Sequence, residues 1–140
     1  MKTDNCIFFQ LAKASQTGIK FMTQKVSGLN ITPVQAMVLG FLAEEDQIIA
    51  GELGKKVELD SATLTGVLDR LEAAGLIERK GNPDDRRSIK IHLTKQGKET
   101  GFEAGKLIEE ANKEFLAAFT ENEKKDLRSL IGKLREQFVK

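Results

Sequence analysis

The sequence predicts a mainly α-helical fold of the α+β class, with four helices, a β-hairpin and two further helices in chain order. Apolar residues recur at three- and four-residue steps along most of the chain, which is the period of an amphipathic helix. Residues 76–93 break this period, with two strand-like runs around a turn-rich segment. At 140 residues, the chain is long enough for one domain with a core and too short for two ordinary ones.

The first half of the chain contains four predicted helices. The first covers residues 4–26, with Gly28 as its stop, and the second begins at Thr32-Pro33. The third and fourth cover residues 51–57 and 61–74. A short extended piece at residues 48–49 precedes the third helix. A threonine N-cap followed by proline is a strong helix start. Asp60 caps the fourth helix and Gly75 stops it. The apolar residues on the inner face of this helix are Leu64, Val67, Leu68 and Leu71.

The second half begins with the hairpin. Its predicted strands are residues 76–80 and 88–93, and in the second strand Ile89, Ile91 and Leu93 alternate with polar residues and are expected to point inward. Residues 81–87 form the charged loop between them. Thr94 then caps a helix to about residue 119, and Thr120 with Glu123 forms a capping box for the last helix.

Three glycines, Gly97, Gly101 and Gly105, lie at four-residue steps in the fifth predicted helix. This spacing is typical of a close helix crossing, and it also occurs as ordinary surface variation. The sequence leaves both alternatives open.

The overall charge is close to neutral, but it is unevenly distributed. Residues 31–74 carry three basic and eight acidic side chains, whereas residues 75–98 carry seven basic and three acidic ones. The basic side chains of the second stretch are Arg79, Lys80, Arg86, Arg87, Lys90, Lys95 and Lys98. A local basic patch on a neutral protein indicates an anionic partner, although a solvated loop would have the same composition.

Composition also limits the class of protein. No apolar run approaches the roughly 20 residues of a membrane span, and the N-terminus lacks the pattern of a signal peptide. The single cysteine, Cys6, excludes an internal disulfide framework. We therefore expect a cytoplasmic protein without a membrane partner.

The two short helices 51–57 and 61–74 are separated by a tight turn, which is helix-turn-helix spacing. In such a motif the second helix enters the major groove of DNA with its N-terminal residues against the bases. The polar residues that this helix offers are Ser61, Thr63, Thr65 and Arg70. The hairpin that follows has Arg86 and Arg87 at its tip, and exposed arginines suit the negative potential of the minor groove. Together these features predict a winged helix-turn-helix that reads double-stranded DNA.

Three segments resemble the wing signature of the MarR family: residues 71–79 (LEAAGLIER), residues 85–88 (DRRS) and residues 93–97 (LTKQG). The helix start at residues 32–35 (TPVQ) also matches, so the resemblance extends over essentially the whole chain. It implies one MarR-like domain, with a winged DNA-binding lobe at 31–97 and dimerisation helices at 1–30 and 98–140. It also implies an obligate homodimer that is usually a repressor, released from DNA by a small anionic or aromatic ligand or by an oxidant.

Carried over by position, the resemblance makes Arg87 the wing arginine in the minor groove, with Asp85 helping to hold it. A two-fold dimer would bind a pseudo-palindromic site. The implied ligand cleft lies between the dimerisation helices and the lobe, with Phe8, Phe21 and Met37 as candidate lining residues. Many family members have an arginine where this chain has Gly66, so a DNA contact of the family is missing here.

Three features of the sequence bear on functions other than DNA binding. Cys6, near the start of the first helix, resembles the thiol of the hydroperoxide-sensing branch of the family, but that branch pairs its thiol with tyrosines and this chain has none. A packing role for Cys6 is the alternative. A structural zinc site needs about four Cys or His ligands, and this chain supplies one of each, Cys6 and His92, far apart in the sequence, so no metal or cofactor is expected. No arrangement of nucleophile and base indicates an enzyme. A winged-helix module that binds only proteins stays open, and salt-dependent binding to duplex DNA would exclude it.

Overall fold

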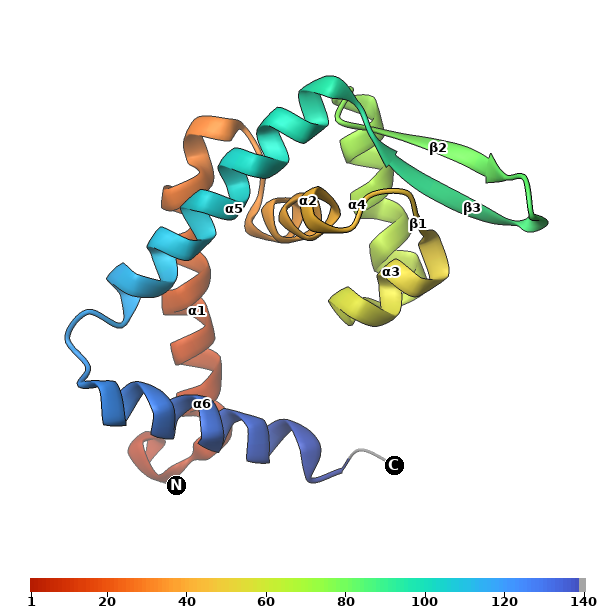
Figure 1. The fold of residues 1–140 in the computed structure, drawn as a ribbon. Helices are drawn as coiled ribbons and strands as arrows, with labels where there is room; N and C mark the ends of the chain where they lie inside the picture. Colours follow the sequence, from red (N-terminus) through yellow and green to blue (C-terminus); the bar gives the residue numbers. More distant parts are fainter. Residues whose placement is uncertain (139–140) are drawn as a thin grey trace.

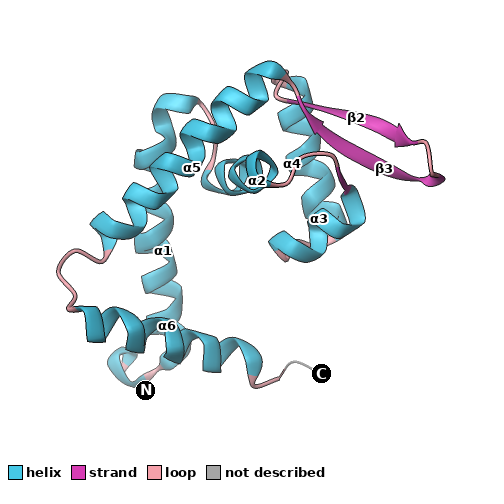
Figure 2. Cartoon of the chain, in the orientation of Figure 1, coloured by secondary structure: helices cyan, strands magenta, loops and turns pink. Residues whose placement is uncertain are grey.

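A computed structural model describes residues 1–138, and it is mostly helical with one small sheet (Figures 1 and 2). This confirms the predicted fold class. The helices are α1 (Ile7–Val26), α2 (Pro33–Glu44), α3 (Ala50–Val57), α4 (Ser61–Ala73), α5 (Lys95–Phe115) and α6 (Glu121–Glu136). The strands are β1 (Ile48–Ile49), β2 (Ile77–Asn82) and β3 (Asp85–Leu93). Short 3-10 turns at Thr3–Asn5 and Ser27–Leu29 flank α1.

Helices α2, α3 and α4 and the sheet form one lobe around the main core. The sheet is antiparallel in the order β1-β3-β2, so the hairpin β2–β3 extends outward from the lobe as a wing (Figure 1). Buried residues from every element of the lobe make up the core: Val38, Leu39, Leu42, Ile48, Leu53, Leu64, Val67, Leu68, Leu71, Leu76, Ile77, Ile91 and Leu93. The four residues predicted for the inner face of α4 are among them.

Helix α5 leaves this lobe and crosses α2 at close range. A Cβ atom added to Gly97 would lie 1.8 Å from the carbonyl oxygen of Leu76, and one added to Gly101 would lie 2.9 Å from the carbonyl oxygen of Leu39. A Cβ atom added to Gly105 would meet nothing within 4 Å. Close packing therefore requires the first two glycines of the series, and the third is not needed for it.

The opposite end of the molecule is built from α1, the second half of α5, and α6. Lys25 at the end of α1 forms ion pairs with Glu110 (3.3 Å) and Glu114 (2.8 Å) of α5. Helix α6 runs back beneath the lobe (Figure 1), and its Arg135 forms an ion pair with Glu58 in the turn between α3 and α4. The α6 residues Leu130, Ile131 and Leu134 remain exposed.

Three expectations for the helices and strands are corrected. The first helix begins at Ile7, because Cys6 has extended backbone angles (φ −94°, ψ 107°) and precedes the helix as its N-cap. Helix α5 ends at Phe115 rather than near residue 119, since the backbone leaves helical geometry at Leu116, which is buried. The strands extend into the segment expected to be a loop.

Ile89 faces the α3–α4 side of the wing as expected, but it is 46% exposed and does not belong to the core. The two residues of β1 pair with β3 only opposite Lys90 and Ile91. The outer part of the wing has no strand of β1 beside it, so Ile89 lies beyond the core.

No single helix within residues 1–138 is both long and apolar enough to cross a membrane. Residues Ile7–Leu29 and Pro33–Glu44 meet the length and composition criteria only as a pair, and that pair is bent by 65°.

Candidate nucleic-acid interface

Helices α3 and α4 meet at a tight turn whose geometry follows from local residues. Glu58 adopts a left-handed conformation (φ 54°), and the backbone N–H of Leu59 donates a hydrogen bond to the carbonyl of Gly54 (3.1 Å). A Cβ atom at Gly54 would lie 3.3 Å from Leu64 Cδ2, so a glycine there lets α4 approach closely. These contacts form the predicted helix-turn-helix.

Asp60 caps α4 as predicted. The backbone N–H of Thr63 donates to Asp60 Oδ1 (2.8 Å), and the Thr63 hydroxyl donates to Oδ2 (3.0 Å). The hydrogen bond from the Thr63 backbone lowers the pKa of the Asp60 carboxyl below its ordinary value. The cap therefore holds an ionised carboxylate at the positive end of the helix dipole.

The side chains expected to touch DNA, Ser61, Thr63, Thr65 and Arg70, are all exposed on α4. The Thr65 hydroxyl donates to the backbone carbonyl of Ser61 (2.8 Å). Because the hydroxyl hydrogens of both threonines are engaged within the helix, their oxygens are left to accept hydrogen bonds. Arg70 forms no ion pair with any residue that the structure describes.

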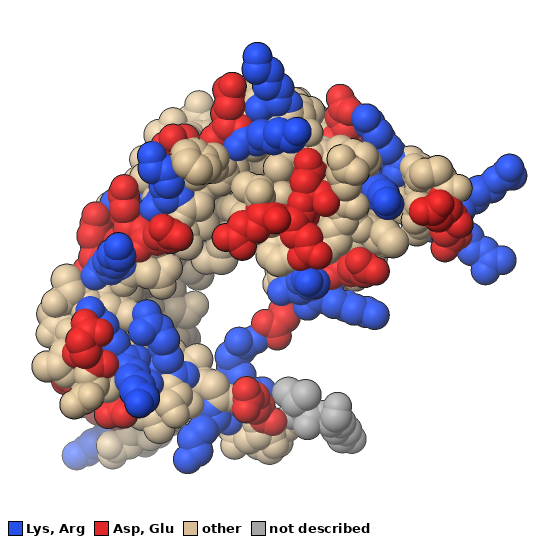
Figure 3. Space-filling model, in the orientation of Figure 1, with Lys and Arg blue, Asp and Glu red and all other residues tan. Residues whose placement is uncertain are grey.

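The wing carries Arg86 and Arg87 near its tip, and both are exposed at the beginning of β3. The backbone N–H of Arg87 donates to Asp85 Oδ1 (3.0 Å), so Asp85 is in contact with the arginine that it was expected to support. In Figure 3 basic side chains project from the end of the wing into solvent.

Asn82 gives the wing tip its shape. It lies at the irregular register between β2 and β3 and is 7% exposed. Its Nδ2 donates to Ser88 Oγ (2.9 Å), and its Oδ1 accepts a hydrogen bond from the backbone N–H of Asp84 (3.0 Å). A buried amide with both ends bonded fixes the turn that presents the two arginines.

A hollow of about 340 Å³ lies between α3, α4 and the wing. Ser61 and Thr65 of α4 line it together with Lys55 of α3, Arg79 of β2 and Ile89 of β3. The structure thus brings two of the predicted residues against the wing, whereas Thr63, Arg70, Arg86 and Arg87 lie outside the lining of this hollow.

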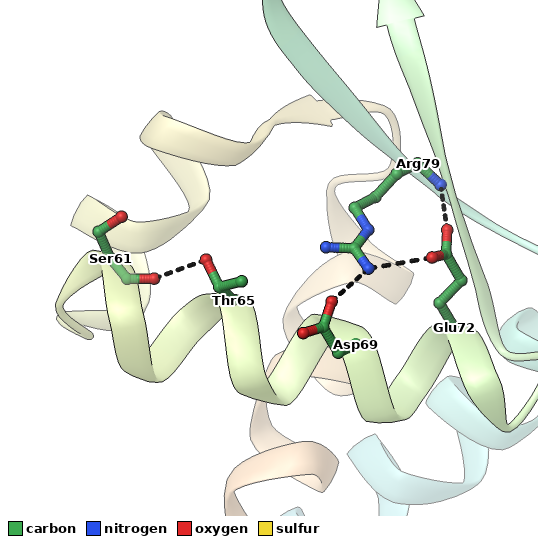
Figure 4. Close-up of polar contacts among 5 residues, drawn as sticks. All are labelled: Ser61, Thr65, Asp69, Glu72 and Arg79. Atoms are coloured by element: carbon green, nitrogen blue, oxygen red, sulfur yellow. Dashed lines mark hydrogen bonds and ion pairs between the residues drawn. The ribbon is translucent and has the colours of Figure 1, made fainter.

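Arg79 connects the base of the wing to α4 (Figure 4). Its Nη2 atom lies 2.5 Å from Asp69 Oδ1 and 3.0 Å from Glu72 Oε1, and its backbone N–H donates to Glu72 Oε2 (3.1 Å). Hydrogen bonding from Arg79 lowers the pKa of the Glu72 carboxyl, and hydrogen bonding to Glu72 and then Asp69 raises the pKa of the guanidinium.

These pairs change the interpretation of the basic patch. Arg79 is neutralised by two carboxylates, and Lys80 lies 3.4 Å from Glu78. The patch residues that form no ion pair within residues 1–138 are Arg86, Arg87, Lys90, Lys95 and Lys98. Unpaired positive charge is therefore shifted from the base of the wing toward its tip and the start of α5.

A second cavity, of about 320 Å³, lies where α1, α2 and α5 meet. Phe21 and Met37, two of the candidate cleft residues, line it. Phe8 does not line it and is 77% exposed near the start of α1, so the structure brings only two of the three candidates together. Cys6 is half-buried as a free thiol.

Comparison with known proteins places the chain in a family. A sequence profile of the MarR family matches residues 31–89. The organic hydroperoxide resistance transcriptional regulator of Bacillus subtilis is 38% identical, over 69% of this chain and just under two thirds (66%) of that regulator. The uncharacterized regulator YdgJ of the same organism is 32% identical over 92% of this chain and 77% of its own length. The chain belongs to the MarR family.

Solved structures of MarR-family regulators have the same fold. A mutant MarR from Escherichia coli, complexed with operator DNA, is 28% identical with a TM-score of 0.81, over 89% of this chain and 90% of that one. The PcaV regulator of Streptomyces coelicolor, in complex with its natural ligand, is 25% identical with a TM-score of 0.87, over 97% and 96%. The MarR family consists of transcription regulators and not of enzymes.

Two features of this MarR-family lobe were not found from the sequence. One is the contact of Arg79 with Asp69 and Glu72, and the other is the bonding of Asn82 to Ser88. Two acidic residues three positions apart on an exposed helix face, followed by an arginine at the start of a strand, are a weak signal for the first. An Asn-Pro pair in the turn is a weak signal for the second.

Proposed function

We propose that this chain is a sequence-specific repressor that binds double-stranded DNA as a homodimer in the cytoplasm. The observation that carries the proposal is the shared hollow, which sets the hydroxyls of α4 beside the wing whose tip carries Arg86 and Arg87. In the proposed complex, α4 lies in the major groove with Ser61 and Thr65 toward the bases. Arg87 enters the adjacent minor groove.

Exposed apolar side chains support the homodimer. They gather on α1 and α6 and at the ends of α5, and they include Ile7, Phe8, Leu11, Ile19, Phe102, Phe115, Phe119, Leu130, Ile131 and Leu134. A monomer would leave this large apolar surface in water, whereas a two-fold dimer would cover much of it. We therefore propose residues 1–30 and 98–140 as the dimerisation half and 31–97 as the DNA-binding lobe. The two α4 helices would then lie roughly 34 Å apart and read a pseudo-palindrome.

The second cavity supports control by a small ligand. It is bounded by α1 and α5 of the dimerisation half and by α2 of the lobe. A ligand that binds better when the lobes are wrongly spaced for DNA releases the operator, and its differential affinity sets the size of the effect.

The test begins with selection of bound fragments from random duplex DNA. Arg87→Ala is expected to weaken binding to the selected operator by about 1–3 kcal/mol, because the minor-groove contact is lost. Arg128→Ala, which removes the same side chain from the exposed surface of α6, is the control and leaves affinity unchanged. Unchanged affinity in Arg87→Ala, with the circular dichroism spectrum intact, would remove the wing from the mechanism. Binding that hardly weakens with salt would favour a protein-interaction module instead.

A second candidate function is redox sensing through Cys6. It is favoured by the relative that is named an organic hydroperoxide resistance regulator. Against it, the sequence holds no tyrosine and no second cysteine to stabilise or resolve an oxidised sulfur. We expect operator binding to be the same before and after mild hydroperoxide, in wild type and in Cys6→Ser. Release of the wild type alone would establish a sensor.

A further inference from the structure

The first two turns of α4, residues 61–66, present threonine oxygens whose hydrogen-bonding role is set within the protein. The hydroxyl of Thr63 lies 3.0 Å from Asp60 Oδ2, and that of Thr65 lies 2.8 Å from the backbone carbonyl oxygen of Ser61 (Figure 4). A backbone carbonyl only accepts hydrogen bonds, and so does an ionised carboxylate, the form that the lowered pKa of Asp60 favours. Both threonines therefore use their hydroxyl hydrogen inside the helix and can only accept a hydrogen bond from a partner outside it.

Within residues 61–66, no side chain carries two hydrogen-bond donors. Ala62 and Gly66 lie one turn apart, between the two threonines on the outer face of α4, and neither has a polar side chain. A Cβ atom added to Gly66 would meet nothing within 4 Å, so this position is open toward a partner. The hydroxyl of Ser61 offers one donor. These two turns therefore present mainly acceptor oxygens and methyl groups.

The cations around these two turns belong to other parts of the lobe. Arg70 is exposed on the third turn, five residues after Thr65, which is about 7.5 Å along the helix axis. Lys55 of α3 and Arg79 of β2 line the hollow between α3, α4 and the wing, and two carboxylates of α4 already bind Arg79. A guanine contact from α3 or α4 would therefore come from the flanking Lys55 or Arg70 rather than from residues 61–66.

Base pairs differ in what they present in the major groove. Guanine presents two acceptors, O6 and N7, and is bound best by a side chain with two donors, such as arginine or lysine. Adenine presents the N6 amino donor, and its partner thymine presents a methyl group at C5. A threonine oxygen that only accepts can bind the adenine amino group while the threonine methyl packs on the thymine methyl. Cytosine also offers an amino donor, but its pair lacks the methyl group and places the two acceptors of guanine against the helix.

We propose that residues 61–66 of α4 read A·T base pairs, through an adenine amino group and a thymine methyl, and disfavour G·C pairs at the same positions. The inference rests on the proposed function, because it requires α4 to lie in the major groove. It adds the class of operator: each half-site has A·T pairs where the first two turns of α4 meet the bases. Thr65 supplies both an oxygen and a methyl group, and each can be removed separately.

The test combines variants of Thr65 with modified operators. Half-sites are selected from random duplex DNA with wild type, and their thymines are then replaced one at a time by deoxyuridine, which lacks only the methyl group. Each replaced thymine that faces α4 is expected to weaken binding about fourfold, the value of one buried methyl group. Thr65→Ser keeps the oxygen and is expected to abolish this loss at one thymine. Thr65→Val keeps the methyl group and the loss, and is expected to bind the unmodified operator about fivefold more weakly, because the adenine amino group has no acceptor.

Thr17→Val on the exposed face of α1 is the matched control. The Thr17 hydroxyl also donates to the carbonyl four residues earlier, that of Lys13 (3.0 Å), so the same internal bond is removed away from the lobe. Operator affinity and the effect of deoxyuridine are expected to stay unchanged. Gly66→Arg places a two-donor side chain on the reading face and is expected to select half-sites with an additional guanine. The same half-site from Gly66→Arg and wild type would show that this face does not meet the bases.

Three results would overturn the inference: no thymine whose replacement weakens binding, Thr65→Ser that keeps the full loss, or a guanine selected at the position that Thr65→Ser affects. Guanines elsewhere in the half-site are expected where Lys55→Gln or Arg70→Gln changes the selection. If no duplex is selected, the proposed function fails and the inference fails with it. If the operator is bound but is indifferent to its thymine methyl groups, only the inference fails.

Discussion

Replacing the three glycines of α5 by alanine, one at a time, should change stability in a graded way. Gly97→Ala is the severe case, because its Cβ would lie 1.8 Å from the carbonyl oxygen of Leu76. That carbonyl also accepts a hydrogen bond from the backbone N–H of Thr94 (3.1 Å), and the Thr94 hydroxyl donates to the carbonyl of Gly75 (2.7 Å). Moving α5 away from Leu76 breaks both bonds, at about 1 kcal/mol each, in addition to the cost of overpacking. We expect a loss of about 3–5 kcal/mol in the free energy of unfolding.

Gly101→Ala and Gly105→Ala are expected to change the free energy of unfolding less than Gly97→Ala does. At Gly101 the new Cβ would lie 2.9 Å from the carbonyl oxygen of Leu39 and 3.3 Å from Ala43 Cβ, so α2 and α5 must separate slightly. The cost, about 1–3 kcal/mol, is partly offset by the better helix propensity of alanine. At Gly105 nothing opposes the methyl group, and Gly105→Ala should stabilise the protein by about 0.5–1 kcal/mol.

The assay is urea denaturation followed by circular dichroism, at one protein concentration for all four proteins because a dimer couples folding to assembly. The urea concentration at the midpoint is expected to fall in the order Gly105→Ala, wild type, Gly101→Ala and Gly97→Ala. If Gly97→Ala is as stable as Gly105→Ala, then α5 does not cross Leu76 at the distance described, and the reasoning is refuted.

Three further predictions concern charge and assembly. Arg79→Gln leaves the carboxylates of Asp69 and Glu72 unpaired on the proposed DNA-binding face and should weaken operator binding about tenfold at low salt. Lys80→Gln is the control and should change operator binding little. Equal effects of the two substitutions would contradict the neutralisation of Asp69 and Glu72 by Arg79. Arg79 lowers the pKa of Glu72 in the folded protein, so this ion pair stabilises the fold at pH values above the unfolded pKa of glutamate, about 4.3. The stabilisation is lost as the pH falls through the lower pKa of folded Glu72. The urea midpoint of wild type should therefore drop more between pH 5 and 3 than the midpoint of Arg79→Gln. Leu134→Asp should yield monomers in light scattering, with Ser129→Asp as the control that stays dimeric.

Features set by neighbouring residues could be predicted from the sequence. The Thr32 and Asp60 N-caps and the Thr120–Glu123 capping box depend on residues close together in the sequence, and all three are present. The inner face of α4 was predicted for the same reason, because helical periodicity alone determines which side of a helix is apolar.

Features that depend on how elements meet could not be predicted in this way. Arg79 reaches Asp69 and Glu72 only because β2 turns back along α4, and the sequence does not specify that angle. Ile89 has the alternation of a buried strand residue, but the length of β1 decides where burial on β3 ends. Phe8 shares the apolar stripe of α1 with Phe21, yet only Phe21 lies at the level where α2 and α5 close the cavity. The DNA contacts assigned to Ser61, Thr63, Thr65, Arg70, Arg86 and Arg87 stay predictions.

The crossing of α5 over α2 has a mechanical consequence. Helix α5 has 21 residues, so it is a rod of about 30 Å that is clamped at Gly97 and Gly101 and carries Ala111 and Phe115 of the cavity near its other end. At Gly97 and Gly101 the backbone of α5 lies directly against the backbone of Leu76 and Leu39. Few side chains there could therefore change conformation to accommodate a tilt of α5. Ala111 lies 14 residues from Gly97, about 21 Å along the helix, so a tilt of about 5° pivoted at the cavity would displace the wing end by about 1.8 Å. A rigid α5 held at these two glycines would in this way carry a small tilt at the cavity to the position of the wing.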